Sequence, residues 1–183
     1  MKLLTIIVLY QPNIEILLKG IRSLIDQSDE VLLYENSKLS DSEIVAIYSN
    51  CGESGAEKIK FVGNGINRGI SGALNFAVDW GVQYSFTHLL TMDQDSHFDL
   101  GGVENFKKII TSLVRQDIGV YSPNPVINGK ATYERNDKGI YFEVDTITSG
   151  SIFSIPLLKH FDGFDDSLFI DAVDYEFCIG YSL

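Results

Sequence analysis

Positive charge is scarce in this chain of 183 residues. Lysine and arginine total 14, against 25 aspartate and glutamate residues, which gives a formal net charge of -11 at pH 7. A protein that docks on DNA or RNA needs a basic face to neutralise phosphates, so this balance argues against a nucleic-acid partner. A small nucleotide that binds together with a divalent cation remains compatible, because the cation supplies positive charge.

Cysteine and long apolar runs are also scarce. The two cysteines, Cys51 and Cys178, form no metal-ligand spacing, so we interpret them as reduced thiols of a cytosolic protein. The longest apolar runs, such as residues 3–10, fall well short of the roughly 20 residues that span a membrane. The sequence begins directly with a predicted strand, which leaves no room for a secretory signal. We therefore expect the protein inside the cell, either free in the cytoplasm or at the inner face of the membrane.

Apolar patterning predicts a single α/β domain in which strands and helices alternate over about the first 120 residues. Predicted strands cover residues 2–10, 30–35, 59–62, 86–92 and 118–121, and predicted helices run from Asn13 to about Gln27, from Ser40 to about Asn50, from Ile70 onward and after Asp99. Asn13 and Asp99 are the predicted N-caps, and Ser40 with Glu43 fits a capping box. Residues 51–57, which contain glycine and serine, are predicted as a loop. Beyond Pro123 the pattern predicts turns, including Asn128-Gly129, and less regular strands to residue 147.

Two carboxylates follow the fourth predicted strand. Asp93 and Asp95 end an apolar stretch, Phe-Thr-His-Leu-Leu-Thr-Met-Asp-Gln-Asp, at 86–95. Residues i and i+2 of an extended chain point to the same side, so the two carboxylates would repel unless a cation or water lies between them. Paired oxygen ligands suit a hard divalent cation, which can then take phosphate oxygens. Nucleotides bind at the carboxyl ends of strands in open α/β sheets, so the motif predicts a nucleotide site. The alternative is a solvated Asp-rich turn.

Polar residues also follow other predicted strands. Gln11 follows the first strand, and Glu35 and Asn36 lie at the end of the second, where the Glu35 carboxylate could accept hydrogen bonds from a base or a ribose. Asn67 and Arg68 lie in a glycine-containing segment, NGINRGISGALN at 64–75, at the start of a predicted helix. Backbone N–H groups there could approach phosphate oxygens, with Arg68 adding charge. Taken alone, each of these residues fits a solvated turn or a flexible helix start equally well.

Carboxylates are concentrated near the C-terminus. The sequence DGFDDSLFIDAVDYEF at 162–177 interleaves acidic with large apolar residues, which is not the pattern of a disordered acidic tail. A carboxylate packed between apolar side chains can have a raised pKa and act as a general base toward a hydroxyl. The alternative is an amphipathic helix with a solvated acidic face. His97, two residues beyond Asp95, is either a further metal ligand or a bystander.

Taken in order, these motifs resemble those of the family 2 inverting glycosyltransferases with the GT-A fold, most closely their rhamnosyltransferase-like branch. The matching segments are TIIVLYQP, ENS, NRGISGALN, LLTMDQDS, TSGSIFSIP and FDGFDDSLFIDAVDYEFC, and they span the whole chain. The resemblance implies an α/β GT-A fold, with a Rossmann-like, doubly wound, mostly parallel sheet and a mixed C-terminal segment. It also implies transfer of a sugar, with inversion, from a nucleoside diphosphate donor (dTDP-rhamnose or a UDP-sugar) to a hydroxyl of a glycan or lipid-linked saccharide.

The resemblance further implies residue roles. Asp93 and Asp95 would hold Mg²⁺ or Mn²⁺, and Asp174 would be the general base, with Glu176 as a second acid. The implied donor-binding residues are Tyr10, Gln11, Pro12, Glu35, Asn67, Arg68, Gly69, Asp93, Gln94 and Asp95, and the implied acceptor-side residues are Thr148, Ser149 and Gly150.

Some positions depart from the family pattern. Glu35 stands where an aspartate is usual, Val173 where a glutamate often precedes the base, and Gly180 where an arginine commonly follows. Members of the family are usually longer, with C-terminal helices that complete the acceptor site and often touch the membrane. We therefore expect a single catalytic domain over residues 1–183, truncated at its C-terminal end, whose association with a membrane would be peripheral.

Two other functions fit the same motifs. A truncated domain could bind a nucleotide without turnover, or act only as a scaffold. A haloacid-dehalogenase-like phosphatase also uses Asp-x-Asp after a strand, with an aspartate as nucleophile. That motif would be expected on the first strand, whereas three predicted strands precede Asp93.

Overall fold

The computed structural model describes residues 1–113, 118–132, 146–170 and 172–180. Its strands are β1 (Leu3–Leu9), β2 (Glu30–Glu35), β3 (Ile59–Gly63), β4 (His88–Asp93), β5 (Val120–Tyr121), β6 (Val126–Ile127), β7 (Lys130–Ala131) and β8 (Ile152–Ser154). Its helices are α1 (Ile14–Leu24), α2 (Asp41–Asn50), α3 (Gly52–Lys58), α4 (Gly69–Gln83), α5 (Gly102–Ser112), α6 (Ile155–His160) and α7 (Val173–Gly180).

The main sheet has six strands in the order β3-β2-β1-β4-β8-β5. The first four strands of this order are parallel, and β8 is antiparallel to both β4 and β5. The predicted α/β fold with a mostly parallel sheet and a mixed C-terminal part is therefore confirmed. The chain adds β2 and β3 on one side of β1 and then crosses to place β4 on the other side. This reversal makes the β1–β4 boundary the switch point at which such sheets bind ligands.

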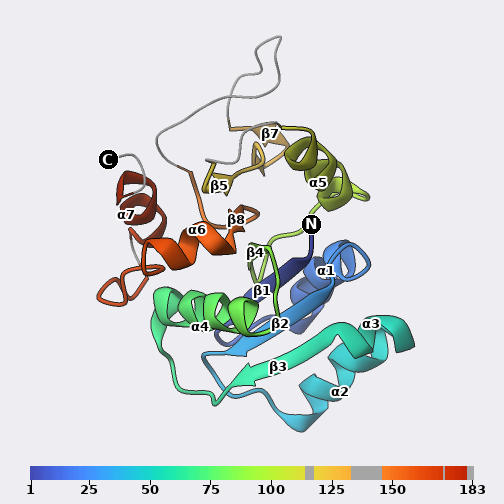
Figure 1. Ribbon diagram of the computed structural model, residues 1–183. Coiled ribbons are helices and arrows are strands. Elements are labelled where there is room, and N and C mark those ends of the chain that lie inside the picture. Colours follow the sequence, from blue (N-terminus) through green and yellow to red (C-terminus); the bar gives the residue numbers. More distant parts are fainter. Residues whose placement is uncertain (114–117, 133–145, 171, 181–183) are drawn as a thin grey trace.

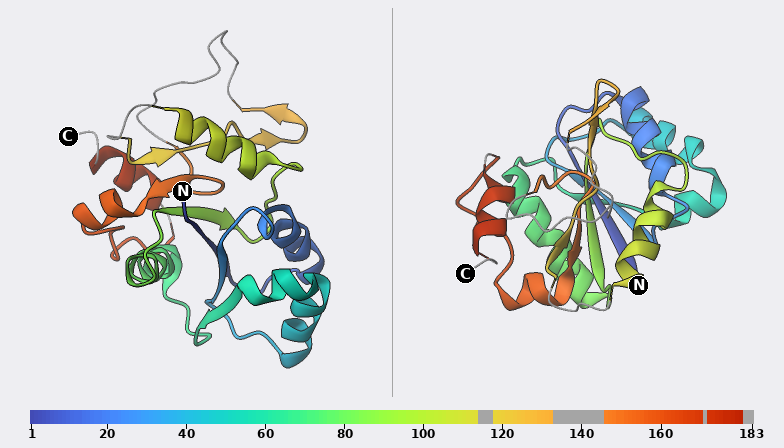
Figure 2. Two further views of the ribbon diagram at one scale, coloured as in Figure 1. Left: turned by 45° about the vertical axis from the view of Figure 1, so that its right-hand side comes forward. Right: turned by 90° about the horizontal axis from the view of Figure 1, so that it is seen from above.

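Helices cover both faces of the sheet (Figures 1 and 2). On one face, α1, α2 and α5 contribute side chains such as Leu17, Ile47 and Ile110 to one buried cluster. On the other face, α4, α6 and α7 contribute Ala77, Leu158 and Phe177 to a second cluster. Because both faces are covered, β1 is an almost continuous apolar run rather than an alternating one.

Local capping signals place the first two helices where the sequence predicts them. The Asn13 side chain accepts hydrogen bonds from the backbone N–H groups of Glu15 and Ile16, so it caps α1. Ser40 and Glu43 form the predicted capping box of α2. Helix α1 ends at Leu24, three residues before the predicted end.

Two local predictions are wrong. Residues 51–57 were predicted as a loop, but Gly52–Lys58 form α3. Packing explains the difference, because Gly55 is buried and a Cβ there would lie 3.3 Å from both Cys51 and Ile25. The predicted cap Asp99 does not cap α5 through its side chain. The helix starts after Gly101, which has a φ of 73°, and the Asp99 carbonyl accepts the Gly102 N–H instead.

The segment after Pro123 contains the predicted Asn128-Gly129 turn, which joins β6 to β7. Both turn residues have positive φ, 51° and 77°, as a two-residue hairpin turn requires. The irregular strands predicted to residue 147 fall mostly on residues 133–145, which lie outside the described residues. Among the helices of the described residues, none has the length and apolar character needed to cross a membrane.

Candidate functional site

A cavity of about 490 Å³ lies at the carboxyl ends of β1, β2 and β4. Its apolar walls are formed by Ile6, Val8, Ile70, Leu74, Met92 and Ile170. Its polar lining is formed by Tyr10, Asn36, Asn67, Thr91, Asp93, Gln94, Asp95, Thr148 and Ser149, with the backbone of Gly69. The cavity therefore sits at the switch point of the sheet and is large enough for a small organic ligand.

Most of the residues predicted to form the site meet here, although they are far apart in the sequence. The predicted site residues that line the cavity are Tyr10, Asn67, Gly69, Asp93, Gln94, Asp95, Thr148 and Ser149. The predicted site residues Gln11, Pro12, Glu35, Arg68 and Gly150 do not line it. His97, the possible extra metal ligand, is exposed and does not line the cavity either.

In this structure Glu35 makes a hydrogen bond within its own turn. Its carboxylate accepts a hydrogen bond from the Leu39 backbone N–H at 3.0 Å, which fixes the turn that leads into α2. The residue after β2 that does line the cavity is Asn36, which is only 3% exposed. The sequence predicts polar site residues at the end of β2, but it assigns the contact with the donor to the Glu35 carboxylate and not to the neighbouring Asn36 amide.

Asn36 joins the end of β2 to the start of α4. Its Nδ2 donates a hydrogen bond to the Gly69 carbonyl at 2.9 Å, and its Oδ1 accepts one from the Arg68 N–H at 3.0 Å. Both partners belong to the segment that the sequence predicted near a donor diphosphate. A buried side chain thus holds one edge of the cavity in place.

Gln94 anchors the backbone of Tyr10. The Gln94 Oε1 accepts the Tyr10 N–H at 2.9 Å, and its Nε2 donates to the Tyr10 carbonyl at 3.1 Å. The next residue, Gln11, has a φ of 46°, and its N–H donates to the Ser37 Oγ at 2.6 Å. These bonds fix the chain after β1, while the Tyr10 side chain stays half exposed at the cavity.

The segment 148–151 is bonded directly to the end of β4. The Thr91 hydroxyl donates to the Thr148 carbonyl, and the Asp93 N–H donates to the Ser149 Oγ at 3.1 Å. The Gly150 N–H donates to the Thr91 carbonyl at 2.7 Å. The predicted acceptor-side residues Thr148 and Ser149 therefore lie beside Asp93, on the far side of β4 from β1.

Asp93 and Asp95 both line the cavity and both are exposed. Within the part of the chain that the structure describes, no group of three or more histidine, cysteine, aspartate or glutamate side chains is arranged to hold a metal ion. Two carboxylates suit Mg²⁺, which commonly takes one or two carboxylates and completes its shell with substrate phosphates and water. The pair fits a cation that binds together with a phosphate ligand.

The start of α4 differs from the prediction that its backbone N–H groups approach phosphate oxygens. Its first N–H groups already have partners within the protein. The Arg68 N–H bonds to Asn36, the Gly69 N–H to the Asn67 Oδ1 and the Ile70 N–H to the Phe169 carbonyl. These three N–H groups are therefore not directed at a phosphate in this structure.

The acidic C-terminal segment is packed only in part. Phe164, Val173 and Phe177 are buried on the α4 face of the sheet, while Phe169 and Ile170 are exposed. Hydrogen bonds from Ser167 hold the pKa of the Asp165 carboxyl below its usual value, opposite to the direction expected for a packed base. The backbone of Asp174 lies in α7, beside the exposed Glu176. Asp171 and the side chain of Asp174 lie outside the described residues.

Comparisons with known proteins bear on the fold. No protein-family model and no curated protein matches the chain. Among solved structures, a crystal structure of S. aureus TarS, residues 1–349, superposes with a TM-score of 0.70 at 21% identity. The chain has a GT-A-like fold. The superposition covers 99% of this chain and 55% of TarS, so the chain spans about half the length of that structure.

A second solved structure shares the fold more distantly. It is the 4-diphosphocytidyl-2C-methyl-D-erythritol synthase from Anaerococcus prevotii, which superposes with a TM-score of 0.52 at 16% identity. The match covers 87% of this chain and 72% of the synthase. Both likenesses concern the fold alone, a mixed α/β architecture with a mostly parallel sheet.

Proposed function

We propose that this protein binds a nucleoside diphosphate sugar with a divalent cation and transfers the sugar to an acceptor hydroxyl with inversion. The observation that carries the proposal is the cavity at the switch point, where Asp93 and Asp95 meet the ends of β1 and β2. The sequence resemblance to family 2 glycosyltransferases points to the same reaction, and the GT-A-like fold supports it.

Different residues of the cavity would bind different parts of the donor and of the acceptor. Tyr10, held by Gln94, would stack against the base, and Asn67 would lie near the diphosphate. Asp93 and Asp95 would hold Mg²⁺ or Mn²⁺, which would neutralise the charge that develops on the departing diphosphate. Thr148 and Ser149 would line the acceptor side, because they lie across β4 from Tyr10.

The proposed general base is Asp174 on α7. It would take the proton from the acceptor hydroxyl as that oxygen attacks the anomeric carbon and the bond to the diphosphate breaks. Helix α7 is fixed to the α4 face of the sheet by Val173 and Phe177, each 2% exposed. A buried anchor on either side of position 174 gives the backbone there a defined place.

The donor and acceptor are proposed from the sequence resemblance. The donor would be dTDP-rhamnose or a UDP-sugar, and the acceptor a growing glycan or a lipid-linked saccharide in polysaccharide biosynthesis. A lipid-linked acceptor would bring the protein to the inner face of the membrane as a peripheral protein. A second candidate function is nucleotide binding without turnover, which the same cavity would support.

The test is thermal unfolding with UDP or dTDP, in Mn²⁺ and in EDTA. A ligand at about 100 times its Kd stabilises the folded state by about 2.7 kcal/mol, which raises the Tm of a chain of this size by about 5–10 °C. We expect this increase with Mn²⁺ and a much smaller one with EDTA. Asp95→Ala should remove the difference without lowering the Tm of the free protein, because Asp95 is exposed.

The matched control is Asp26→Ala, which removes an exposed carboxylate at the end of α1, away from the cavity lining. This variant should keep the full effect of Mn²⁺. Equal stabilisation by nucleotide in Mn²⁺ and in EDTA would rule out a cation held by Asp93 and Asp95. No stabilisation by either nucleotide would rule out the proposed function.

A further inference from the structure

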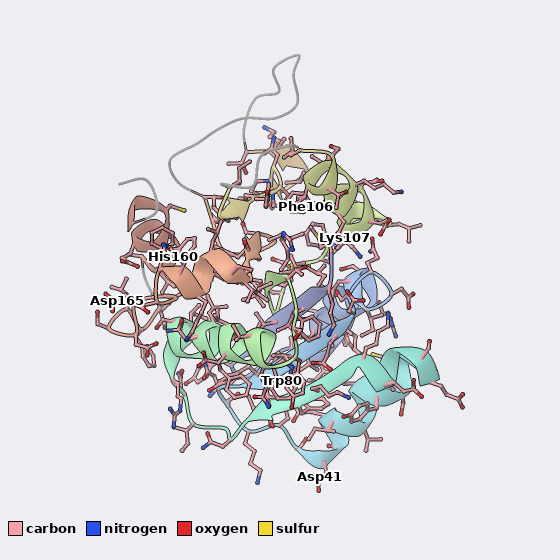
Figure 3. All side chains as sticks on the ribbon, viewed as in Figure 1. Asp41, Trp80, Phe106, Lys107, His160 and Asp165 are labelled. Carbon is pink, nitrogen blue, oxygen red and sulfur yellow. The ribbon has the colours of Figure 1, made fainter. Side chains whose placement is uncertain are left out.

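Residues 163–170, here called the strap, lie beside the N-terminal end of α4, at the label of Asp165 in Figure 3. Ile170 at the end of the strap lines the cavity. Two hydrogen bonds join the end of the strap to the first turn of the helix. The Ile70 N–H donates to the Phe169 carbonyl at 2.7 Å, and the Ser71 hydroxyl donates to the Leu168 carbonyl at 2.5 Å. The strap thus accepts the backbone N–H of Ile70 at the N-terminus of α4.

Asn75 holds the start of the strap with both ends of its amide. Its Nδ2 donates to the Phe164 carbonyl at 2.8 Å and to the Asp166 Oδ1 at 2.6 Å. Its Oδ1 accepts the Phe164 N–H at 2.9 Å. This one side chain therefore makes three of the five hydrogen bonds named between the strap and α4.

Two glycines allow the close approach of strap and helix. Gly69 has a φ of 74°, and a Cβ there would overlap with the Phe169 carbonyl oxygen. Gly163 has a φ of 83°, and a Cβ there would overlap with the Asn75 Oδ1. The chain has glycine at both contact points, so the geometry is accommodated without strain.

Apolar burial holds the strap most firmly at its beginning, and Leu168 further along is partly buried against the same cluster. Phe164 is 3% exposed and packs against Phe153 and Phe177, with ring centroids 5.5 and 5.1 Å apart. Phe169 and Ile170 at the other end are 49% and 60% exposed. Since these last two residues are only partly buried, the hydrogen bonds to α4 contribute to the position of the end of the strap.

We propose that Asn75 is a positioning residue, which sets the strap and thereby one wall of the nucleotide cavity. Ile170 at the end of the strap lines the cavity together with Ile70 and Leu74 of α4. The strap also leads into α7, which carries Asp174. The proposal rests on the proposed function, because it gives Asn75 a part in binding the donor without contact to it.

The test measures the Kd for UDP and for dTDP in Mn²⁺ by calorimetry, together with hydrogen exchange of peptides that cover residues 163–170. In the wild-type chain the nucleotide should slow exchange in the strap. Asn75→Ala should speed exchange there and raise the Kd at least ~10-fold, which corresponds to a loss of about 1.4 kcal/mol of binding free energy. Asn75→Asp should do the same, because its carboxylate faces the Asp166 carboxylate.

A rescue separates positioning from general destabilisation. In the double variant Asn75→Asp/Asp166→Asn the donor and acceptor are exchanged, so a hydrogen bond between the two side chains can form again. This variant should recover part of the lost affinity at pH 7.5, because the Phe164 carbonyl still lacks the donor that the Asn75 Nδ2 supplied. Asn50→Ala is the matched control, because Asn50 also makes two hydrogen bonds, to Arg22 and Ala46, on a helix on the other face of the sheet. It should bind as the wild type does.

Three results would overturn the proposal. Asn75→Ala with the wild-type Kd would show that the strap does not shape the cavity. If Asn75→Ala lowers the Tm together with the affinity, and the double variant restores none of the affinity, then Asn75 is a structural residue only. Failure of the wild-type chain to bind either nucleotide would refute the proposed function, and this inference with it, and is recognised before any variant is made.

Discussion

Asn36→Ala should lower both the stability of the protein and its affinity for a nucleotide. The substitution removes two buried hydrogen bonds, to Gly69 and Arg68, from a side chain that is 3% exposed. Each such bond contributes about 1 kcal/mol, and the Gly69 carbonyl loses its amide donor in a partly closed site. The expected loss is therefore about 2–3 kcal/mol, which corresponds to a decrease in Tm of about 5–10 °C for a chain of this length.

The same substitution frees the start of α4 from the end of β2. Amide exchange should therefore increase in peptides that cover residues 65–70, and the Kd for UDP in Mn²⁺ should rise. Asn36→Asp should bind the nucleotide more weakly than Asn36→Ala at pH 7, because it adds a carboxylate to a cavity already lined by Asp93 and Asp95. Calorimetry measures the affinities, and thermal unfolding measures the stabilities.

Asn50→Ala is a control matched in chemistry. Asn50 also donates and accepts a hydrogen bond, but it is exposed, so its loss should change the free energy of unfolding by no more than about 0.5 kcal/mol. If Asn36→Ala melted at the temperature of Asn50→Ala, with unchanged exchange in residues 65–70, the two bonds would not hold the cavity edge. The reasoning from burial and bonding would then be wrong.

Two further predictions concern a side chain near α3 and the proposed base. Burial raises the pKa of the Cys51 thiol, so less thiolate is present at pH 8 and labelling with a disulfide reagent should be slower than for free cysteine. An equal rate would contradict this, and unfolding in guanidinium should abolish the difference. Asp174→Asn should retain Mn²⁺-dependent nucleotide binding and lose transfer by about 10²–10⁴-fold. Release of nucleoside diphosphate from candidate nucleotide sugars, with saccharide acceptors present, measures the transfer, and a rate equal to that of the wild type would assign the base to another residue.

Local patterns predicted the regular elements well because their causes are local. The apolar run of β1 and the caps at Asn13 and Ser40 each act within a few residues of the chain. The loop predicted at 51–57 failed for the opposite reason. A short glycine-containing helix, α3, is stabilised by packing of Gly55 against Ile25, which lies 30 residues away in the sequence.

Several predicted site residues line one cavity, because parallel strands bring their carboxyl ends to one edge. Asp93 and Asp95 were predicted from their position after a strand, Asn67 from a glycine-containing helix start and Tyr10 from the family resemblance. Asn36 was noted only as a polar residue at a strand end, and Asn75 only as the last residue of the glycine-containing segment, because nothing in their local sequence indicates that they link distant segments. Their hydrogen-bond partners lie 32 to 91 residues away in the sequence. A side-chain amide links two segments only when both its N–H and its carbonyl oxygen bond to backbone groups of the other segment.

The sequence by itself determined that strands and helices alternate and that two carboxylates end the fourth strand. Only the tertiary structure decided that β4 lies beside β1, that the ends of β1, β2 and β4 enclose a cavity, and that the strap bonds to the start of α4. Periodicity and caps are properties of neighbouring residues. Strand order and the pairing of distant polar groups depend instead on covering both faces of the sheet at once while leaving few buried polar groups without partners.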